Sequence, residues 1–162
     1  MKGLFAAIAM ASTVLLAPVA GADPLNLEKM QAMVTGMGHT PKQQTKADGT
    51  PSTTFEITIT TEGFNVPIGV EISPSGRYIW CKASLGKSQL TSDDAMAVLK
   101  RLSSVQPTTV WITSSDILMM GIAIDNRDVT PEHLKYIFDK LAADVGNMAD
   151  LWQKPAATPA PQ

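Results

Sequence analysis

Hydrophobic and polar residues alternate along three consecutive segments in the first half of the chain. Residues 53–61, 66–72 and 77–85 each carry an apolar residue at every second position. Alternation with a period of two is typical of a β-strand that buries one of its faces. Turn-forming residues fill 62–65 and 73–76 between these segments. We therefore expect three antiparallel strands joined by short turns.

Three other segments carry apolar residues at helical spacing. The first begins at residues 23–24, an acidic cap followed by a first-turn proline. The second begins at Thr91, which is followed three residues later by the aspartate of a capping box. The third begins at residues 130–132, and its apolar stripe continues to Trp152 over about six turns. These patterns predict three amphipathic helices.

Two further strands are expected between the second and third helices. Residues 109–113 alternate, whereas residues 117–124 are apolar almost throughout. A run of this kind predicts a central strand covered on both faces, with a buried helix as the alternative. The segment 39–52 is polar, contains proline and glycine, and predicts a loop. We therefore predict an α+β fold with a single antiparallel five-stranded sheet and three packed helices, in the order α-β-β-β-α-β-β-α.

The first 22 residues have the layout of a secretory signal peptide. Lys2 is their only charge, residues 4–17 are small or apolar, and Ala20-Gly21-Ala22 has the spacing of a cleavage site. The apolar run is shorter than the about 20 residues that a membrane-spanning helix needs. We therefore expect an exported protein, periplasmic or secreted, with no stable membrane anchor after cleavage.

The remainder predicts a single domain over residues 23–153, followed by a disordered tail rich in proline and alanine over 154–162. Removing residues 1–22 changes the formal net charge from −2 to −3, and the chain has no basic block. We therefore expect no binding to nucleic acid. Cys81 is the only cysteine, which excludes an intramolecular disulfide. Its alternation predicts a buried strand residue, with a free or intermolecularly paired thiol as the alternative.

Residues that carry chemistry form no catalytic or metal-binding pattern. His39 lies in a polar loop, His133 lies in the first turn of a helix, and neither belongs to a zinc-binding spacing. The acidic run 125–128 lacks the later glycine and glutamate of a calcium loop. No serine occupies a G-x-S-x-G motif. We therefore predict that the protein is not an enzyme and uses no cofactor or metal.

Aromatic residues mark one candidate binding surface. Tyr78 and Trp80 alternate with the expected core residues of their strand, and Trp111 does the same in another strand. With regular pleating these side chains share a sheet face with polar neighbours, which is typical of an interface. They are our candidate partner-binding residues. The alternative is that the second helix covers them and makes them core.

A second candidate surface is an apolar pocket between the sheet and the last helix. Met30 and Met37 lie on the apolar stripe of the first helix, and Trp152 ends the stripe of the last. Flexible thioethers suit adaptable binding surfaces, and an apolar pocket would accept a small apolar ligand. The alternative is that the methionines simply fill the core.

The order of elements resembles the type III secretion chaperone-like fold, which is shared with the YbjN family. The residues that carry this resemblance follow two turns: Ser75-Gly76-Arg77-Tyr78-Ile79-Trp80, and the stretch from Leu134 to Leu151-Trp152 after Thr130-Pro131-Glu132. The similarity covers roughly residues 27–152.

This resemblance implies a binding module, because secretion chaperones of this fold dimerise and hold extended segments of partner proteins along their surface. YbjN-like proteins have no clear enzymatic role. The signal peptide departs from the cytoplasmic chaperones, so we expect the fold to carry over but not the delivery of cargo inside the cytoplasm. Our leading hypothesis is an exported, non-enzymatic, chaperone-like domain that binds an unknown protein partner. It self-associates as a homodimer through the second helix or the aromatic face. The alternative is a carrier of a small apolar ligand.

Overall fold

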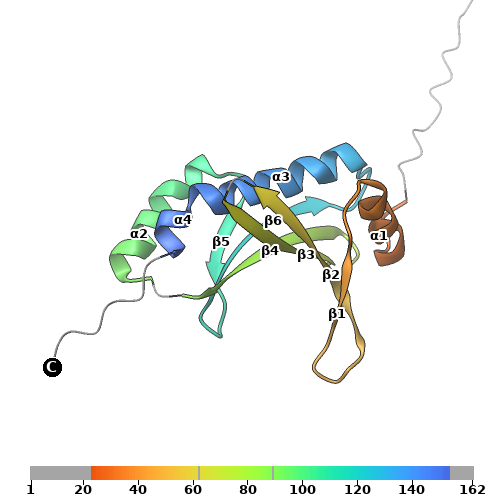
Figure 1. The fold of residues 1–162 in the computed structure, drawn as a ribbon, viewed down its shortest axis with the longest axis horizontal. Coiled ribbons are helices and arrows are strands. Elements are labelled where there is room, and N and C mark those ends of the chain that lie inside the picture. The colour runs from red at the N-terminus through yellow and green to blue at the C-terminus, as the bar shows by residue number, and fades with distance from the viewer. Residues whose placement is uncertain (1–22, 62, 89, 154–162) are drawn as a thin grey trace, which may run out of the picture.

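A six-stranded antiparallel sheet with the strand order β1-β2-β3-β4-β6-β5 is the framework of the molecule (Figure 1). The computed structural model describes residues 23–61, 63–88 and 90–153. Each strand pairs antiparallel with its neighbours. The strands are β1 (Lys42–Thr45), β2 (Pro51–Thr61), β3 (Phe64–Ile72), β4 (Tyr78–Lys87), β5 (Thr109–Ile112) and β6 (Ile117–Asp125).

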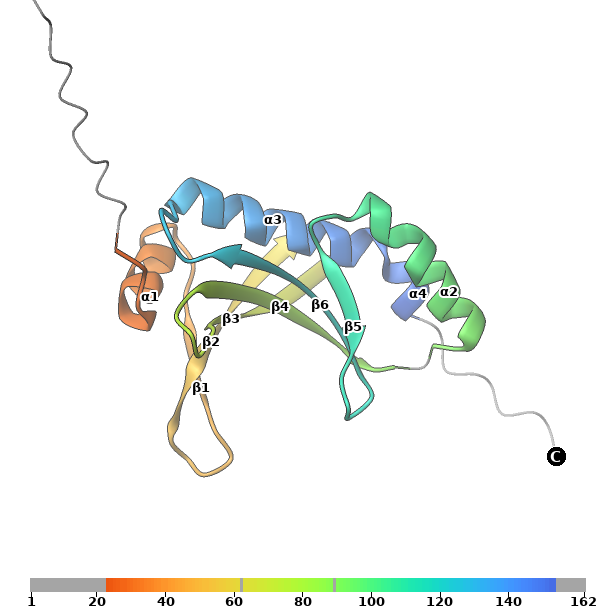
Figure 2. The ribbon, with the colours of Figure 1, turned by 180° about the vertical axis from the view of Figure 1, so that it is seen from behind.

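The helices lie on one side of this sheet (Figures 1 and 2). The longest, α3, runs along the sheet, with α1 near one of its ends and α2 and α4 near the other (Figure 2). Their bounds are α1 (Leu27–Gly36), α2 (Ser92–Arg101), the 3-10 turn η1 (Leu102–Ser104), α3 (Pro131–Asn147) and α4 (Ala149–Trp152). No helix in the described parts of the chain is both long and apolar enough to cross a membrane.

The α+β class is confirmed, but the predicted count of five strands and three helices is wrong. The additional strand, β1, forms a hairpin with β2 inside the segment 39–52 that we expected to be a loop. All four of its residues are exposed. Because no residue of β1 is buried, its sequence has no alternation of apolar and polar residues that would predict a strand. Backbone hydrogen bonds to β2 hold it in place.

The fourth helix arises because the expected last helix is interrupted. At Met148 the backbone leaves the helical region, with φ −104° and ψ 10°. The remaining residues form the separate turn α4, whose side chain Leu151 still reaches the core. The apolar spacing continues across the break, so hydrophobic periodicity alone predicts one helix.

Two other expectations need correction. Helix α1 begins at Leu27 rather than at residues 23–24, because Asn26 is the cap and its side chain accepts a hydrogen bond of 2.8 Å from the Lys29 N–H. Strand β6 is central, as predicted, but the helices cover only one of its faces. Met120 is fully buried on the helix side, whereas Ala123 on the opposite face is exposed.

The core lies between the sheet and α3. The alternation predicted for β2, β3 and β4 places their apolar residues against this helix, whose Phe138 is fully buried. The predicted caps of the other helices are also present, with the Thr91–Asp94 capping box on α2 and Thr130 capping α3. The predicted signal peptide, residues 1–22, and the predicted tail, residues 154–162, lie outside the described residues.

Candidate functional site

The sheet face opposite the helices, which we call the open face, carries the side chains that alternate with the core. In β4, Ile79, Cys81 and Ala83 are buried under the helices, while the residues between them point the other way. The strand register continues this second face across the sheet, because directly paired residues share a face. Its paired members include Thr54, Glu56, Gly69, Glu71, Trp80, Lys82, Ser84, Thr109, Trp111, Met119, Gly121 and Ala123.

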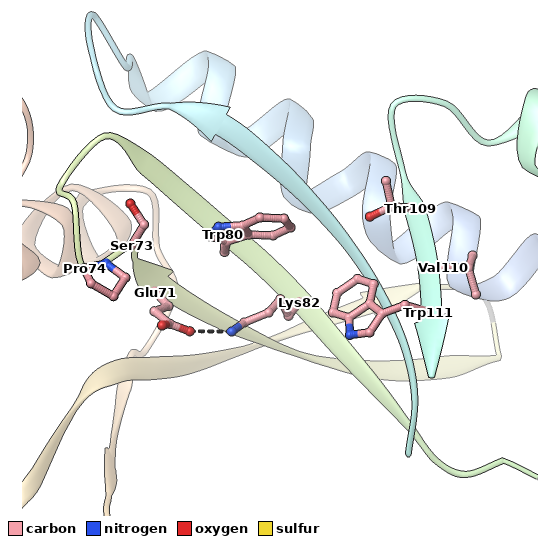
Figure 3. A pocket seen from close by; sticks show the side chains of 8 residues that line it. All are labelled: Glu71, Ser73, Pro74, Trp80, Lys82, Thr109, Val110 and Trp111. Atoms are coloured by element: carbon pink, nitrogen blue, oxygen red, sulfur yellow. Dashed lines mark hydrogen bonds and ion pairs between the residues drawn. The ribbon is translucent and has the colours of Figure 1, made fainter. Parts of the chain in front are cut away.

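The structure brings Trp80 and Trp111 together on the open face. The two residues come from β4 and β5, which flank β6. Their ring centroids lie 6.4 Å apart with an interplanar angle of 70°, an edge-to-face contact (Figure 3). Both side chains are half-buried, and α2 packs instead against η1 and α4. The pair is therefore neither ordinary core nor two isolated surface residues.

Gly121 makes this arrangement possible. A Cβ atom at this position would lie 2.9 Å from the Cη2 atom of Trp111 and 2.9 Å from the carbonyl oxygen of Cys81. Neither distance is compatible with van der Waals packing. The missing side chain in β6 lets the Trp111 ring lie across that strand toward Trp80. The sequence showed this glycine only as an interruption in an apolar run, and its role depends on the pairing of three strands.

A hollow of about 400 Å³ lies beside the tryptophan pair (Figure 3). Its lining residues are Glu71, Ser73, Pro74, Trp80, Lys82, Thr109, Val110 and Trp111. Glu71 and Lys82 form an ion pair in it, and their side chains are 26% and 28% exposed. These two residues are eleven positions apart, and the β3–β4 register brings them together. Sequence reasoning missed the ion pair because it depends on that register.

A second hollow of about 260 Å³ adjoins the first, since both are lined by Lys82. It extends toward β1 and β2, with Gln44, Thr54 and Glu56 among its lining residues. The open face thus carries an aromatic half near β5 and a polar half near β1. This layout suits an elongated ligand that crosses several strands.

Tyr78, the third predicted aromatic, lies on the same face at the start of β4 and is 39% exposed. It is not among the residues that line the tryptophan hollow. The Arg77 guanidinium carbon lies 5.4 Å from the centroid of its ring. Asp125, paired with Tyr78 across β4 and β6, accepts hydrogen bonds from Arg127 at 2.7 and 2.8 Å. These bonds lower the pKa of Asp125 to about 2.

Of the three residues predicted to line an apolar pocket, Met30 and Met37 belong to α1 and its end, whereas Trp152 ends α4. Met30 is fully buried in α1, and Met37 follows the same helix. Helices α1 and α4 lie near opposite ends of α3 (Figures 1 and 2). At the α4 end, Trp152 contacts Phe64, with ring centroids 5.9 Å apart and ring planes tilted by 55°. The hollow at that end has about 200 Å³, which is below the about 300 Å³ at which small-molecule pockets usually begin.

The reactive side chains are engaged in packing or in local structure. Cys81 is fully buried, which raises the pKa of its thiol to about 12. The His39 ring makes an edge-to-face contact with the Phe138 ring, with ring centroids 6.0 Å apart. Asn126, in the acidic run 125–128, is buried. Its side chain accepts a hydrogen bond from the Leu25 N–H and donates hydrogen bonds to the Leu25 and Gly76 carbonyl oxygens. Across the described ranges, no group of three or more His, Cys, Asp or Glu residues could hold a metal ion.

Further apolar side chains are exposed on α2 and, separately, on the edge strand β5. Met96 and Leu99 of α2 are 55% and 59% exposed, and Ile112 of β5 is 47% exposed. Their neighbours Val98 and Val110 are buried and half-buried, respectively. Strand β5 is an edge of the sheet, so alternation places Ile112 on the helix side without a helix to cover it.

Comparison with solved structures finds a similar fold in a complex from a type III secretion system. A chain in the heterodimeric complex ExoU–SpcU from the type III secretion system of Pseudomonas aeruginosa matches with a TM-score of 0.53 and 12% identity, covering 76% of this chain and 98% of that chain. A chain in the complex of the Yersinia pestis type III secretion chaperone SycH with a stable fragment of YscM2 matches with a TM-score of 0.49 and 10% identity, with the same two coverages. No family model and no curated protein matches the sequence. The chain therefore shares its fold with a chain of the ExoU–SpcU complex.

Proposed function

We propose that this protein is an exported, non-enzymatic, chaperone-like domain that holds an extended segment of a partner protein on its open face. The observation that carries the proposal is the half-buried Trp80–Trp111 pair beside a 400 Å³ hollow, on a sheet face that no described helix covers. Large aromatic side chains dominate binding energy at protein interfaces. Export rests on the signal pattern of residues 1–22, and a relation to the YbjN family rests on the sequence pattern alone.

The shape of the open face favours an extended polypeptide. The two hollows adjoin at Lys82 and run from the β5 side to the β1 side. Apolar side chains of a bound segment would pack on the tryptophans, and its polar groups would meet Glu56, the Glu71–Lys82 pair and Thr54. The known structure of similar fold, ExoU–SpcU, is itself a heterodimeric complex, which supports a protein as the partner.

Self-association is the second part of the proposal. Met96 and Leu99 are three residues apart on α2, so they lie on the same exposed face of that helix. A second copy would cover these side chains, and a homodimer is the simplest symmetric arrangement. Light scattering should give a dimer mass that falls to the monomer mass in Leu99→Glu. Because Cys81 is buried, reductant should not change the mass. A wild-type monomer, or a dimer lost only on reduction, would contradict this part.

Peptide selection tests the binding function and does not require the natural partner. Protein expressed from the full chain is used to select binders from a displayed peptide library, and the affinities of the selected peptides are then measured by calorimetry. We expect Trp80→Ala and Trp111→Ala each to weaken binding by at least about tenfold, since interface hot spots contribute about 2 kcal/mol or more.

The matched control is Tyr136→Ala. Tyr136 is another exposed aromatic, at 57%, but it lies on α3 on the helix side of the sheet. Its variant should bind the selected peptides as the wild type does. Equal affinity of the tryptophan variants and the wild type would contradict the proposal, provided that urea unfolding shows that they are folded.

A further inference from the structure

We infer that the proline-rich segment 154–162 of this chain is itself a ligand of the hollow beside Trp80 and Trp111. The protein then carries its own competitor, which a partner segment must displace. The intrachain contact is independent of the proposed function. Only the competition with a partner rests on it.

The chemistry of the segment matches that of the hollow. Its sequence is Lys-Pro-Ala-Ala-Thr-Pro-Ala-Pro-Gln, without an acidic or a large apolar residue. Proline-rich sequences favour the polyproline II helix, whose carbonyl groups are free to accept hydrogen bonds. Aromatic-lined grooves recognise this helix by packing on the proline rings. Trp80, Trp111 and Pro74 form such apolar walls here.

Hydrogen-bond donors are also available in the hollow. The Trp152 indole N–H donates to the Val145 carbonyl at 2.9 Å. In contrast, the indole N–H groups of Trp80 and Trp111 have no acceptor among the residues that the structure describes. Two free donors beside the aromatic walls are the groups that a polyproline II segment would use.

The length of the segment is compatible with a path from the end of the described structure to this hollow. Gln153 is the last described residue, and its neighbour Trp152 lies beside Leu118 at the start of β6. The next residue of that strand, Met119, pairs with Trp111 in β5. Nine residues of polyproline II span about 28 Å at about 3.1 Å per residue, whereas packed layers are only about 10 Å apart. The segment can therefore pass around the β5 edge from the helix side to the open face.

A contact within one chain needs little intrinsic affinity. Short tethers give effective concentrations in the millimolar range. If the isolated segment bound with a millimolar dissociation constant, it would therefore occupy the hollow in about half of the molecules. The composition of the segment indicates the class of ligand: extended and rich in proline, with one basic residue, Lys154, and no acidic or bulky apolar side chain.

The test compares protein from the full chain with a variant that stops after Gln153. A synthetic peptide of residues 154–162 is added to each, and the three tryptophan indole N–H signals are followed by NMR after assignment with Trp→Phe variants. In the shortened variant we expect the signals of Trp80 and Trp111 to shift in a saturable way. That of Trp152, which bonds within the fold, should stay in place. The full chain should bind the added peptide at least about twofold more weakly, because its own segment competes at an effective concentration similar to its dissociation constant.

A control peptide with alanine in place of the three prolines should cause no shift. Failure of the proline peptide to shift the Trp80 and Trp111 signals in the shortened variant would overturn the inference. Equal shifts from both peptides, or equal affinity for the full and shortened proteins, would also overturn it.

The result is separable from the proposed function. If the proline peptide does not bind but the tryptophan variants still lose the library-selected peptides, the inference fails and the proposed function stands. If the proline peptide binds but the selected peptides ignore the tryptophan substitutions, the inference stands and the proposed function fails.

Discussion

The two faces of the same sheet differ in what covers them, although both carry large apolar side chains. On the helix side, Phe138 of α3 and Cys81 of β4 are fully buried. On the open face, Trp80 and Trp111 are only half-buried, and a hollow lies beside them. Burial of apolar surface stabilises the first face within the chain. On the second face, part of that surface stays available for another molecule. Strand alternation therefore identifies the residues of a face, while helix placement decides which face is used for folding.

The largest loss of stability is expected for a substitution on the helix side of the sheet. Phe138→Ala removes a fully buried aromatic ring between α3 and the sheet. We expect the free energy of unfolding to fall by about 3–5 kcal/mol, measured by urea denaturation. Tyr136→Ala, on the exposed side of the same helix, should change it by less than about 0.5 kcal/mol. Similar losses in the two variants would break the distinction between covered and exposed positions.

A smaller loss of stability is expected at Gly121, which lies under the Trp111 ring on the open face. Gly121→Ala places a methyl group 2.9 Å from the Trp111 ring and the Cys81 carbonyl, so the ring must move. We expect a loss of about 1–3 kcal/mol in unfolding free energy, as for other overpacked sites, and a changed tryptophan fluorescence spectrum.

Gly69→Ala is the matched control on the same face. Its methyl group would meet the nearest atoms, on Lys82 and Thr54, at 3.7 Å, an ordinary contact. This variant should keep the wild-type spectrum and stability. A spectrum that is unchanged in Gly121→Ala would show that this glycine does not position Trp111.

The smallest change in unfolding free energy is expected for Asp125, which ends β6 at the border of the open face. The pKa of Asp125 is lowered from 3.8 to about 2, first by its hydrogen bond with the Arg127 side chain. Because the folded pKa lies below the unfolded one, the ionised carboxylate stabilises the fold above about pH 4, and this contribution is lost as the pH falls toward 2. Asp125→Asn should therefore lower stability slightly at pH 5 and not near about pH 2, measured by urea denaturation. Arg127→Ala should remove the same pH-dependent component; a constant difference across the range would contradict this account.

Much of the fold follows from the sequence because burial leaves a periodic trace. The alternation of Ile79, Cys81 and Ala83 and the apolar stripe of α3 predict which side chains meet in the core. Strand β1 could not be predicted in this way, since none of its residues is buried. The break at Met148 was equally hidden, because the backbone changes conformation there while the apolar spacing continues.

The candidate site was predictable only in part. Alternation placed Trp80 and Trp111 on a common face, but their contact depends on the strand order β4-β6-β5 and on the missing side chain of Gly121. The Glu71–Lys82 ion pair depends in the same way on the register of two strands. Such features arise from tertiary pairing, which a local pattern does not contain. The position of α2 relative to Trp80 and Trp111 likewise depends on tertiary packing and could not be predicted from the sequence.

The most direct test of the central claim is a map of where a bound peptide contacts the protein. Backbone amide shifts of the full chain are recorded by NMR during titration with a library-selected peptide. We predict the largest changes at open-face residues such as Lys82, Trp111 and Met119, with little change along the exposed side of α3 at Lys135 and Tyr136. Changes concentrated on α2 or α3, with the open face unaffected, would contradict the assignment of the open face as the binding surface.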